Sequence, residues 1–277
     1  MTSVSDLLLE SADRFGPRPA LISDGQVHTY SQLAFEVRSR LRALRASGAE
    51  RGTRVALLME NGAHFVAAYY AVLATGAAVV PLNPLLAPRE LVHALRDSSP
   101  VLLLSAGSLE LVAAEVAEIT GLPHVAWTEV PTDDSSLTAT GTDPSDEAVV
   151  IYTSGTTGTP KGAVLTHSNL LWNAWICASP RLFGFTPDDV ILAALPLFHA
   201  YGQTCIMNAG LLAGSSLVLM TRFRPDDALQ LMERHASASS KACPRCMWRY
   251  SSPRAASRTI VSGCDSAPLA ELPSRKP

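Results

Sequence analysis

Short apolar runs alternate with amphipathic stretches through most of this chain, and this alternation constrains the fold more than any other feature. The apolar runs have the length of strands, whereas the stretches between them repeat apolar residues at helical spacing. The predicted strands up to residue 130 lie at 20–22, 27–30, 55–59, 78–82, 101–104 and 124–127. The predicted helices lie at 5–15, 63–74, 89–96 and 109–119. This order predicts an α/β fold of mainly parallel sheets with helices on both faces.

Two local signals organise the N-terminal part. Asp24-Gly25 lies between two apolar runs and predicts a hairpin turn. Ser31 is predicted to cap the helix that follows, because a serine side chain can accept a hydrogen bond from a backbone N–H of the first turn. Apolar residues recur on one face of this helix: Leu33, Val37, Leu41 and Leu44. Their spacing predicts that the helix continues to residue 44.

A polar segment divides the pattern into two regions. Residues 131–147 have no apolar period, and they predict a connector between a first α/β region, 1–130, and a second, 148–235. In the second region, strands are predicted at 148–151, 163–166, 190–195 and 216–220, and helices at 168–177, 201–212 and 225–235.

The pattern ends near residue 236. Residues 236–258 contain six serines, five basic residues and no acidic residue, and their apolar residues follow neither period. Two interpretations remain open: a disordered basic surface segment, or a stretch translated out of frame. Cys243 and Cys246 lie in this segment without a second paired ligand set, which argues against a zinc site.

Composition excludes several classes of protein. A net charge of −3 with 47% hydrophobic residues is typical of a globular protein and argues against a nucleic-acid binder. The longest apolar runs, 67–82 and 205–220, are shorter than a membrane span, so no stable span is predicted. The N-terminal segment lacks a basic stretch, so no signal peptide is predicted. Five cysteines, an odd number, favour a reducing compartment, and the expected location is cytoplasmic.

One loop, residues 152–162 (YTSGTTGTPKG), carries a specific chemical signal. Its hydroxyl and backbone N–H groups can surround phosphate oxygens, its glycines allow the backbone to approach closely, and Lys161 offers a positive charge. A strand pattern follows this loop, whereas a helix follows the lysine of a Walker loop. We therefore predict a polyphosphate loop of another kind, which joins two strands. A solvated linker is the alternative that composition alone allows.

The wider sequence around this loop, 152–170 (YTSGTTGTPKGAVLTHSNL), resembles the AMP-forming acyl-CoA synthetases, or fatty-acid–CoA ligases, of the adenylate-forming superfamily. Three other stretches resemble the same family in the expected order: 29–33 (TYSQL), 73–84 (LATGAAVVPLNP) and 196–202 (PLFHAYG). The last has the form that lines the acyl site of acyl-CoA ligases, and it favours that class over amino-acid adenylation.

The resemblance implies a two-step reaction and the residues that serve it. A fatty or aryl carboxylate would attack the α-phosphate of ATP and expel pyrophosphate, and the thiol of CoA would then displace AMP from the acyl-adenylate. The implied phosphate-binding residues are Thr153, Ser154, Gly155, Thr156, Thr157, Gly158 and Lys161, with Mg²⁺ at the phosphates near Thr157. The implied acyl-site residues are His199, Tyr201, Gly202 and Gln203, and the implied catalytic residues are Lys161 and His199. The alternative for His199 is a histidine at the end of a core strand that bonds a backbone carbonyl.

The resemblance returns once more, at 260–272 (IVSGCDSAPLAEL) within the last region, 259–277. This piece is similar to the adenine-side segment and implies nucleotide contacts from Gly263, Cys264 and Asp265, although Cys264 stands where a glycine is usual. The mobile C-terminal domain of the family, with its adenylation lysine, does not follow. We therefore expect a truncated, catalytically incomplete N-terminal portion of a synthetase. The alternatives are a ligase completed by a second chain and a non-catalytic nucleotide- or acyl-binding module. No particular protein partner is predicted.

Overall fold

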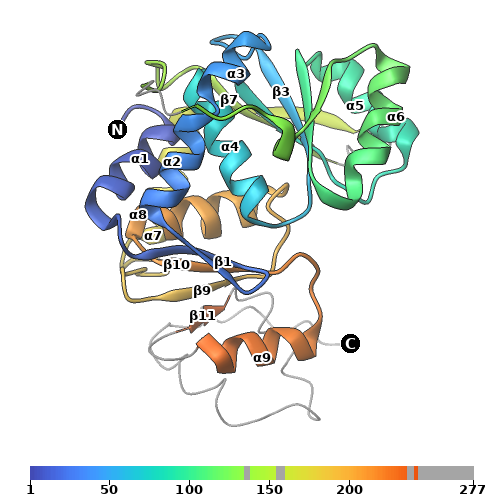
Figure 1. Cartoon of the computed structure of the whole chain (residues 1–277). Helices are drawn as coiled ribbons and strands as arrows, with labels where there is room; N and C mark the ends of the chain where they lie inside the picture. Colours follow the sequence, from blue (N-terminus) through green and yellow to red (C-terminus); the bar gives the residue numbers. More distant parts are fainter. Residues whose placement is uncertain (134–137, 154–159, 236–239, 243–277) are drawn as a thin grey trace, which may run out of the picture.

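The computed structural model describes residues 1–133, 138–153, 160–235 and 240–242, and it confirms the α/β fold class. Layers of helices and sheets alternate through the molecule (Figure 1). A pair of helices covers the outer face of the larger sheet. A central set of helices separates this sheet from a smaller one, and a last helix covers the outer face of the smaller sheet.

The larger sheet has six strands in the order β6-β5-β3-β4-β7-β8. Neighbouring strands are parallel except for the last pair, β7 and β8, which is antiparallel. The strands are β3 (Arg54–Leu58), β4 (Ala78–Pro81), β5 (Leu102–Ser105), β6 (His124–Ala126), β7 (Glu147–Thr153) and β8 (Lys161–Thr166). All carboxyl ends of the parallel strands therefore lie at one edge.

The smaller sheet has five strands in the order β11-β9-β10-β1-β2, and only the hairpin β1–β2 is antiparallel. Its central pairing joins Leu21 of β1 to Leu217 of β10, from opposite ends of the described chain. Both predicted regions, 1–130 and 148–235, thus contribute strands to each sheet. The strands are β1 (Pro19–Ser23), β2 (Gln26–Thr29), β9 (Val190–Ala193), β10 (Ser216–Leu219) and β11 (Ser240–Ala242).

The prediction that residues 236–258 are irregular throughout is wrong at Ser240–Ala242. These three residues form β11 and pair in parallel with β9. Backbone hydrogen bonding to the edge of β9 forms this strand, so a periodic pattern of apolar side chains is not needed. The remainder of that segment lies outside the described residues.

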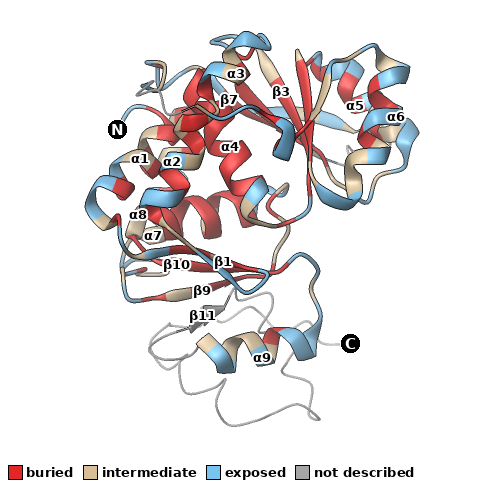
Figure 2. Ribbon diagram, in the orientation of Figure 1, coloured by how far each residue is buried: buried red, intermediate tan, exposed pale blue. Residues whose placement is uncertain are grey.

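Successive strand residues enter different cores, because strand side chains alternate between the two faces of a sheet. In β3, Leu57 joins the central core and Leu58 joins the outer core beneath α5 and α6. In β9, Ile191 joins the central core and Leu192 joins the core beneath α9. The central helices are enclosed between the sheets, and Figure 2 shows them lined with buried residues.

The central layer holds most of the helices. It contains α1 (Val4–Phe15), α2 (Tyr30–Ser39), α3 (Leu41–Ala46), α4 (Ala63–Thr75), α7 (His167–Ala178), the π-helix η3 (Tyr201–Asn208) and α8 (Ala209–Ala213). The outer layers contain α5 (Pro88–Ser98), α6 (Glu110–Thr120) and α9 (Pro225–His235). Short 3₁₀ turns lie at η1 (Gly107–Leu109) and η2 (Trp127–Glu129). Among the described helices, none combines the length and the apolar character that crossing a bilayer requires.

The start of α2 differs from the prediction. Thr29, not Ser31, caps this helix: its Oγ1 accepts a hydrogen bond from the Gln32 N–H at 3.2 Å, and the Gln32 side chain accepts one from the Thr29 N–H at 2.8 Å. This reciprocal pair leaves no capping role for Ser31, which lies inside the first turn. The predicted continuous helix to Leu44 is also interrupted, because α2 ends at Ser39 and α3 begins at Leu41.

Candidate functional site

The predicted polyphosphate loop joins two antiparallel strands, as expected. The register of β7 and β8 places Thr153 opposite Lys161 and Tyr152 opposite Gly162. Thr153 and Lys161 are both exposed. The structure therefore brings the two ends of the loop together, one hydroxyl facing one cation. The loop interior, with Ser154, Gly155, Thr156, Thr157 and Gly158, lies outside the described residues.

The base of this hairpin is held by close packing. A Cβ at Gly162 would lie 2.9 Å from Val150 Cγ1, so glycine allows the strands their close approach here. The Tyr152 hydroxyl donates to Asp97 Oδ2 at 2.6 Å and lies 3.1 Å from the Ala94 carbonyl, which attaches the hairpin to α5. Burial, and then the neighbouring Asp97, raises the pKa of Tyr152, so this phenol remains a proton donor at neutral pH.

The predicted acyl motif, 196–202, forms a tight turn between β9 and η3. The His199 N–H donates to the Pro196 carbonyl at 3.2 Å, and the His199 carbonyl accepts from the Gln203 N–H at 2.9 Å. A Cβ at Gly202 would overlap the Pro196 carbonyl oxygen, so this position favours glycine. The prediction of a regular helix from Tyr201 is corrected, since η3 is a π-helix, a form that is often found at functional sites.

The four predicted acyl-site residues differ in exposure. His199 is exposed, and its ring lies 4.7 Å from the Phe198 ring, centroid to centroid. Tyr201 is 40% exposed, whereas Gly202 and Gln203 are buried. The exposed imidazole does not end a core strand, so the alternative drawn from the sequence does not describe it.

Gln203 contributes a buried polar group that is only half satisfied. Its Nε2 donates to the Leu197 carbonyl at 3.3 Å. Its Oε1 has no hydrogen-bond partner among the described residues, although the side chain is 0% exposed. A buried acceptor without a partner costs about 1–3 kcal/mol, so a group that donates to it would be bound favourably.

Asn61 contacts the predicted acyl motif, and sequence reasoning missed it. Its Nδ2 donates to the Leu195 carbonyl at 2.9 Å, and its Oδ1 accepts from the Leu197 N–H at 2.8 Å. The amide thereby pins the chain on either side of Pro196, at the start of the acyl motif. A usable signal was present, because polar residues that follow a parallel strand lie at the edge where α/β proteins bind ligands.

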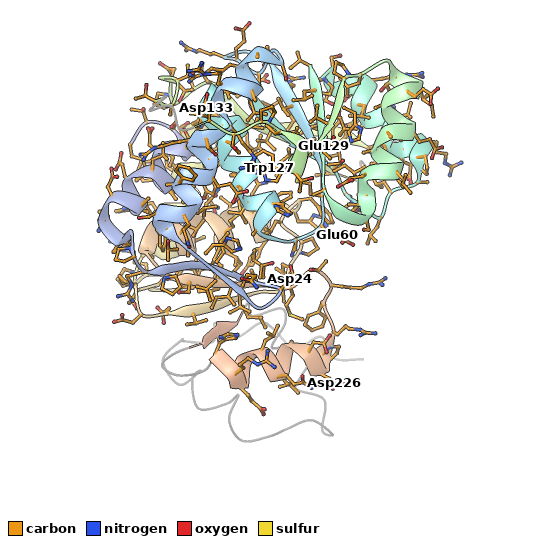
Figure 3. The ribbon with its side chains drawn as sticks, in the orientation of Figure 1. Asp24, Glu60, Trp127, Glu129, Asp133 and Asp226 are labelled. Atoms are coloured by element: carbon orange, nitrogen blue, oxygen red, sulfur yellow. The ribbon has the colours of Figure 1, made fainter. Side chains whose placement is uncertain are left out.

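The Asn61 bridge joins the two sheets at their carboxyl edges. Asn61 follows β3 of the larger sheet, whereas Leu195 and Leu197 follow β9 of the smaller one. Thr153 ends β7 at the same edge of the larger sheet as the end of β3. Figure 3 shows Glu60, the neighbour of Asn61, in the connection that runs from the larger sheet toward the smaller. The hairpin and the acyl motif therefore lie on the same side of the molecule.

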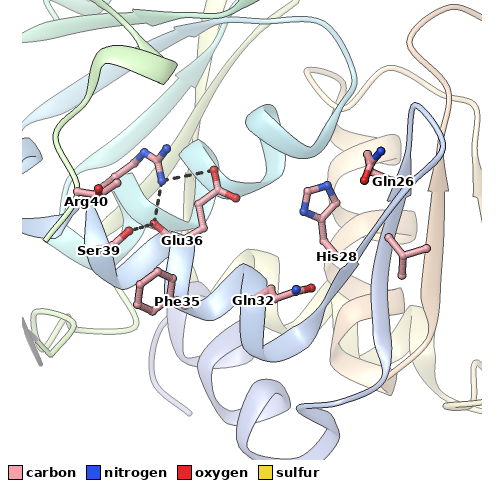
Figure 4. A pocket seen from close by; sticks show the side chains of 9 residues that line it. Gln26, His28, Gln32, Phe35, Glu36, Ser39 and Arg40 are labelled. Carbon is pink, nitrogen blue, oxygen red and sulfur yellow. Dashed lines mark hydrogen bonds and ion pairs between the residues drawn. The ribbon is translucent and has the colours of Figure 1, made fainter. Parts of the chain in front are cut away.

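A shallow pocket of about 420 Å³ lies elsewhere, between β2 and α2 (Figure 4). Its charged wall is internally paired: Glu36 lies 3.4 Å from Arg40 and accepts from Trp127 Nε1 at 3.1 Å. The Arg40 guanidinium also covers the Trp127 ring at 4.4 Å. These contacts attach η2 to the C-terminal end of α2. None of the described residues that line the pocket belongs to the predicted site.

A family model described as AMP-binding enzyme matches residues 8–257. This chain belongs to the AMP-binding enzyme family. The resemblance to acyl-CoA synthetases is confirmed by relatives that include the long-chain-fatty-acid–CoA ligase of Bacillus subtilis (strain 168). It is 28% identical over an alignment 272 residues long, gaps included, that covers 84% of this chain and 49% of the relative. The feruloyl-CoA synthase of Amycolatopsis sp is 35% identical over 212 residues, covering 76% of this chain and 42% of the relative. The chain spans about half the length of these curated relatives.

Solved structures agree with this assignment. ATP-bound MatB from Rhodopseudomonas palustris superposes with a TM-score of 0.74 at 28% identity, covering 84% of this chain and 48% of that one. The o-succinylbenzoate CoA synthetase of Bacillus subtilis, in complex with ATP and magnesium, has a TM-score of 0.74 at 29% identity, covering 84% and 62%. The chain thus has the α/β fold of adenylate-forming enzymes over the part that it spans.

Proposed function

We propose that this chain carries the ATP- and acid-binding part of an AMP-forming acyl-CoA ligase. It would hold a fatty or aryl carboxylate against the α-phosphate of ATP. The carboxylate oxygen would form a bond to phosphorus as the bond to pyrophosphate breaks, and the thiol of CoA would later displace AMP. The observation that carries the proposal is the β7–β8 hairpin, in which Thr153 faces Lys161 at the two ends of a Ser/Thr/Gly loop.

The chemistry of the hairpin fits a nucleoside triphosphate. Lys161 supplies a cation and Thr153 a hydroxyl donor on one exposed edge, and both are suited to phosphate oxygens. Pyrophosphate leaves with increasing negative charge, so a fixed cation there stabilises the transition state more than the ground state. Ser154, Gly155, Thr156, Thr157 and Gly158 would complete the cradle. Mg²⁺ would neutralise phosphate charge near Thr157.

The acid would bind at the turn 196–203. His199 is exposed and can donate from its imidazole to a carboxylate, while Tyr201 and Gly202 flank it at the start of η3. The buried Oε1 of Gln203 can accept a hydrogen bond from a bound donor, including an ordered water. We propose that Gly263, Cys264 and Asp265, which lie outside the described residues, contact the adenine. We propose that the part of the fold that this chain spans binds MgATP without efficient turnover by itself.

Calorimetric titration of the purified chain with ATP, ADP and AMP, with and without Mg²⁺, tests the nucleotide site. If Lys161 holds the β- and γ-phosphates, Lys161→Ala lowers MgATP affinity by about tenfold or more, since a charge-assisted hydrogen bond contributes about 1.5–3 kcal/mol. AMP affinity changes little. Arg89→Ala removes an exposed cation on α5 and serves as the matched control. An equal loss in both variants, or the same loss for AMP, contradicts the proposed site.

ATP–pyrophosphate exchange with a panel of fatty and aryl acids tests the chemical step. Saturable MgATP binding without exchange supports a binding part that needs the remainder of a ligase. Robust exchange by this chain alone would refute the statement that it is catalytically incomplete, and it would support the proposed ligase site. If neither binding nor exchange is detected in a folded sample, the functional proposal fails.

A further inference from the structure

Two cysteines from different helices meet at one side chain. The Sγ atoms of Cys177, on α7, and Cys205, on η3, each lie 3.4 Å from Oδ1 of Asn173. Both are reduced thiols. Because they share one acceptor atom, the two sulfurs are separated by no more than twice that distance.

The two thiols differ in access to solvent. Cys177 is 3% exposed, whereas Cys205 is half-buried. A small oxidant can therefore reach Cys205 first. The other three cysteines of the chain lie outside the described residues.

We propose that Cys177 and Cys205 form an oxidative modification site, at which a peroxide converts the thiol pair into a disulfide linking α7 to the π-helix. The proposal stands on the thiol geometry and is independent of the proposed ligase function. A disulfide needs an S–S distance of about 2.0 Å and Cβ atoms about 3.5–4.5 Å apart. Rotation of the two side chains toward each other, away from Asn173, is the movement that this requires.

The reaction proceeds in two balanced steps. The Cys205 thiolate attacks one peroxide oxygen, so an S–O bond forms, the O–O bond breaks, and the departing hydroxide takes up a proton to leave as water. Cys177 then loses its proton and attacks the sulfenic sulfur, forming the S–S bond and releasing the second oxygen as water. The two thiols lose two electrons, and the peroxide is reduced to two waters. Burial raises the pKa of the Cys177 thiol, so near neutral pH this thiol attacks more slowly than an exposed thiol would.

Asn173 acts as a positioning residue. Its amide oxygen accepts a hydrogen bond from each thiol and keeps both on one side of α7. The amide itself does not react with peroxide or with the thiols. The disulfide would restrain η3 two residues after Gln203 and four after Tyr201, and both of these residues belong to the turn that we assign to the acid. Oxidation would therefore reduce the freedom of the π-helix at the place where the acid is proposed to enter.

Peroxide titration of the full chain tests the proposal. A background with Cys243→Ser, Cys246→Ser and Cys264→Ser isolates the pair. The expected result is a loss of two titratable thiols and a cross-linked peptide pair containing residues 177 and 205, reversed by dithiothreitol. Cys177→Ser should leave a dimedone-reactive sulfenic acid on Cys205, and Cys205→Ser should slow oxidation of Cys177 at least tenfold.

Peptide mapping of the unmutated chain keeps the test valid if the serine variants fold poorly. Sulfenic acid accumulating on Cys205 without the cross-link overturns the proposal. A cross-link that forms only after unfolding in urea also overturns it. Hydrogen exchange should slow across Tyr201–Asn208 in the oxidised chain, and unchanged exchange there contradicts the restraint on η3.

Discussion

Asn61→Ala tests whether the bridge between the two sheets stabilises the molecule. The substitution removes two short hydrogen bonds, one to the Leu195 carbonyl and one from the Leu197 N–H. Leu197 is 0% exposed, so its N–H has no ready replacement from water, whereas Leu195 is only half-buried. An unpaired buried group costs about 1–3 kcal/mol, and the Leu195 carbonyl falls at the lower end. We expect the free energy of unfolding to fall by about 2–4 kcal/mol.

Urea unfolding followed by circular dichroism measures this change, and hydrogen exchange at the Leu197 amide locates it. Asn61→Asp keeps the acceptor and loses the donor, so the Leu197 amide should stay more protected than in Asn61→Ala. Asn83→Ala is the matched control, because its amide accepts from an exposed Leu85 N–H that water can satisfy. A loss below about 0.5 kcal/mol in Asn61→Ala, or a loss equal to that in Asn83→Ala, would refute the reasoning.

Three further predictions concern stability. Tyr70→Phe removes the hydroxyl that donates to Asn208 Oδ1 at 2.7 Å in the central core. The free energy of unfolding, measured in urea titrations, should fall by about 1–3 kcal/mol. No change would show that this hydrogen bond does not stabilise the fold. Gly202→Ala should cost about 1–3 kcal/mol, because its Cβ would meet a backbone oxygen, whereas Gly141→Ala, with open space around it, should be neutral; equal melting temperatures contradict this. Burial lowers the pKa of His167 below its ordinary 6.5, so the unfolded chain binds a proton first and stability is lost as pH falls from about 6.5 through the folded pKa. His167→Gln should flatten this part of a pH series of unfolding curves, and an unchanged slope would exclude His167 as its source.

Strand and helix order could be predicted because it depends on local periodicity. The strands around 55–59, 78–82 and 101–104 and the helix Pro225–His235 agree with their patterns to within a few residues. The cap of α2 was misassigned because Thr29 and Ser31 are both good capping residues, and only the reciprocal bond with Gln32 distinguishes them. Strand β11 could not be predicted, since its pairing with β9 joins backbones and requires no side-chain pattern.

The candidate site was only partly accessible to sequence reasoning. The loop 152–162 and the turn 196–202 carry compositional signals, and their residues were named in advance. Whether the loop and the turn lie on the same side of the molecule depends on how the two sheets associate. A short stretch of sequence does not determine that association. Asn61 has no motif of its own: its importance comes from two backbone groups more than a hundred residues away in the chain. The close approach of Gly202 to Pro196 at the start of η3 likewise belongs to the folded chain and has no local sequence signal.

The pairing of β1 with β10 has a consequence for synthesis on the ribosome. Leu21 can pair with Leu217 only after Leu217 has been synthesised. Nearly the whole described chain therefore emerges before β1 and β10 can pair in the smaller sheet. At about 5–20 residues per second, this interval of roughly 200 residues lasts on the order of 10–40 s. During that time β1, with the apolar residues Ala20 and Leu21, has no partner strand on the side of β10, although both residues are fully buried in the finished fold. Nascent chains should therefore depend on chaperone protection over a period set by translation speed.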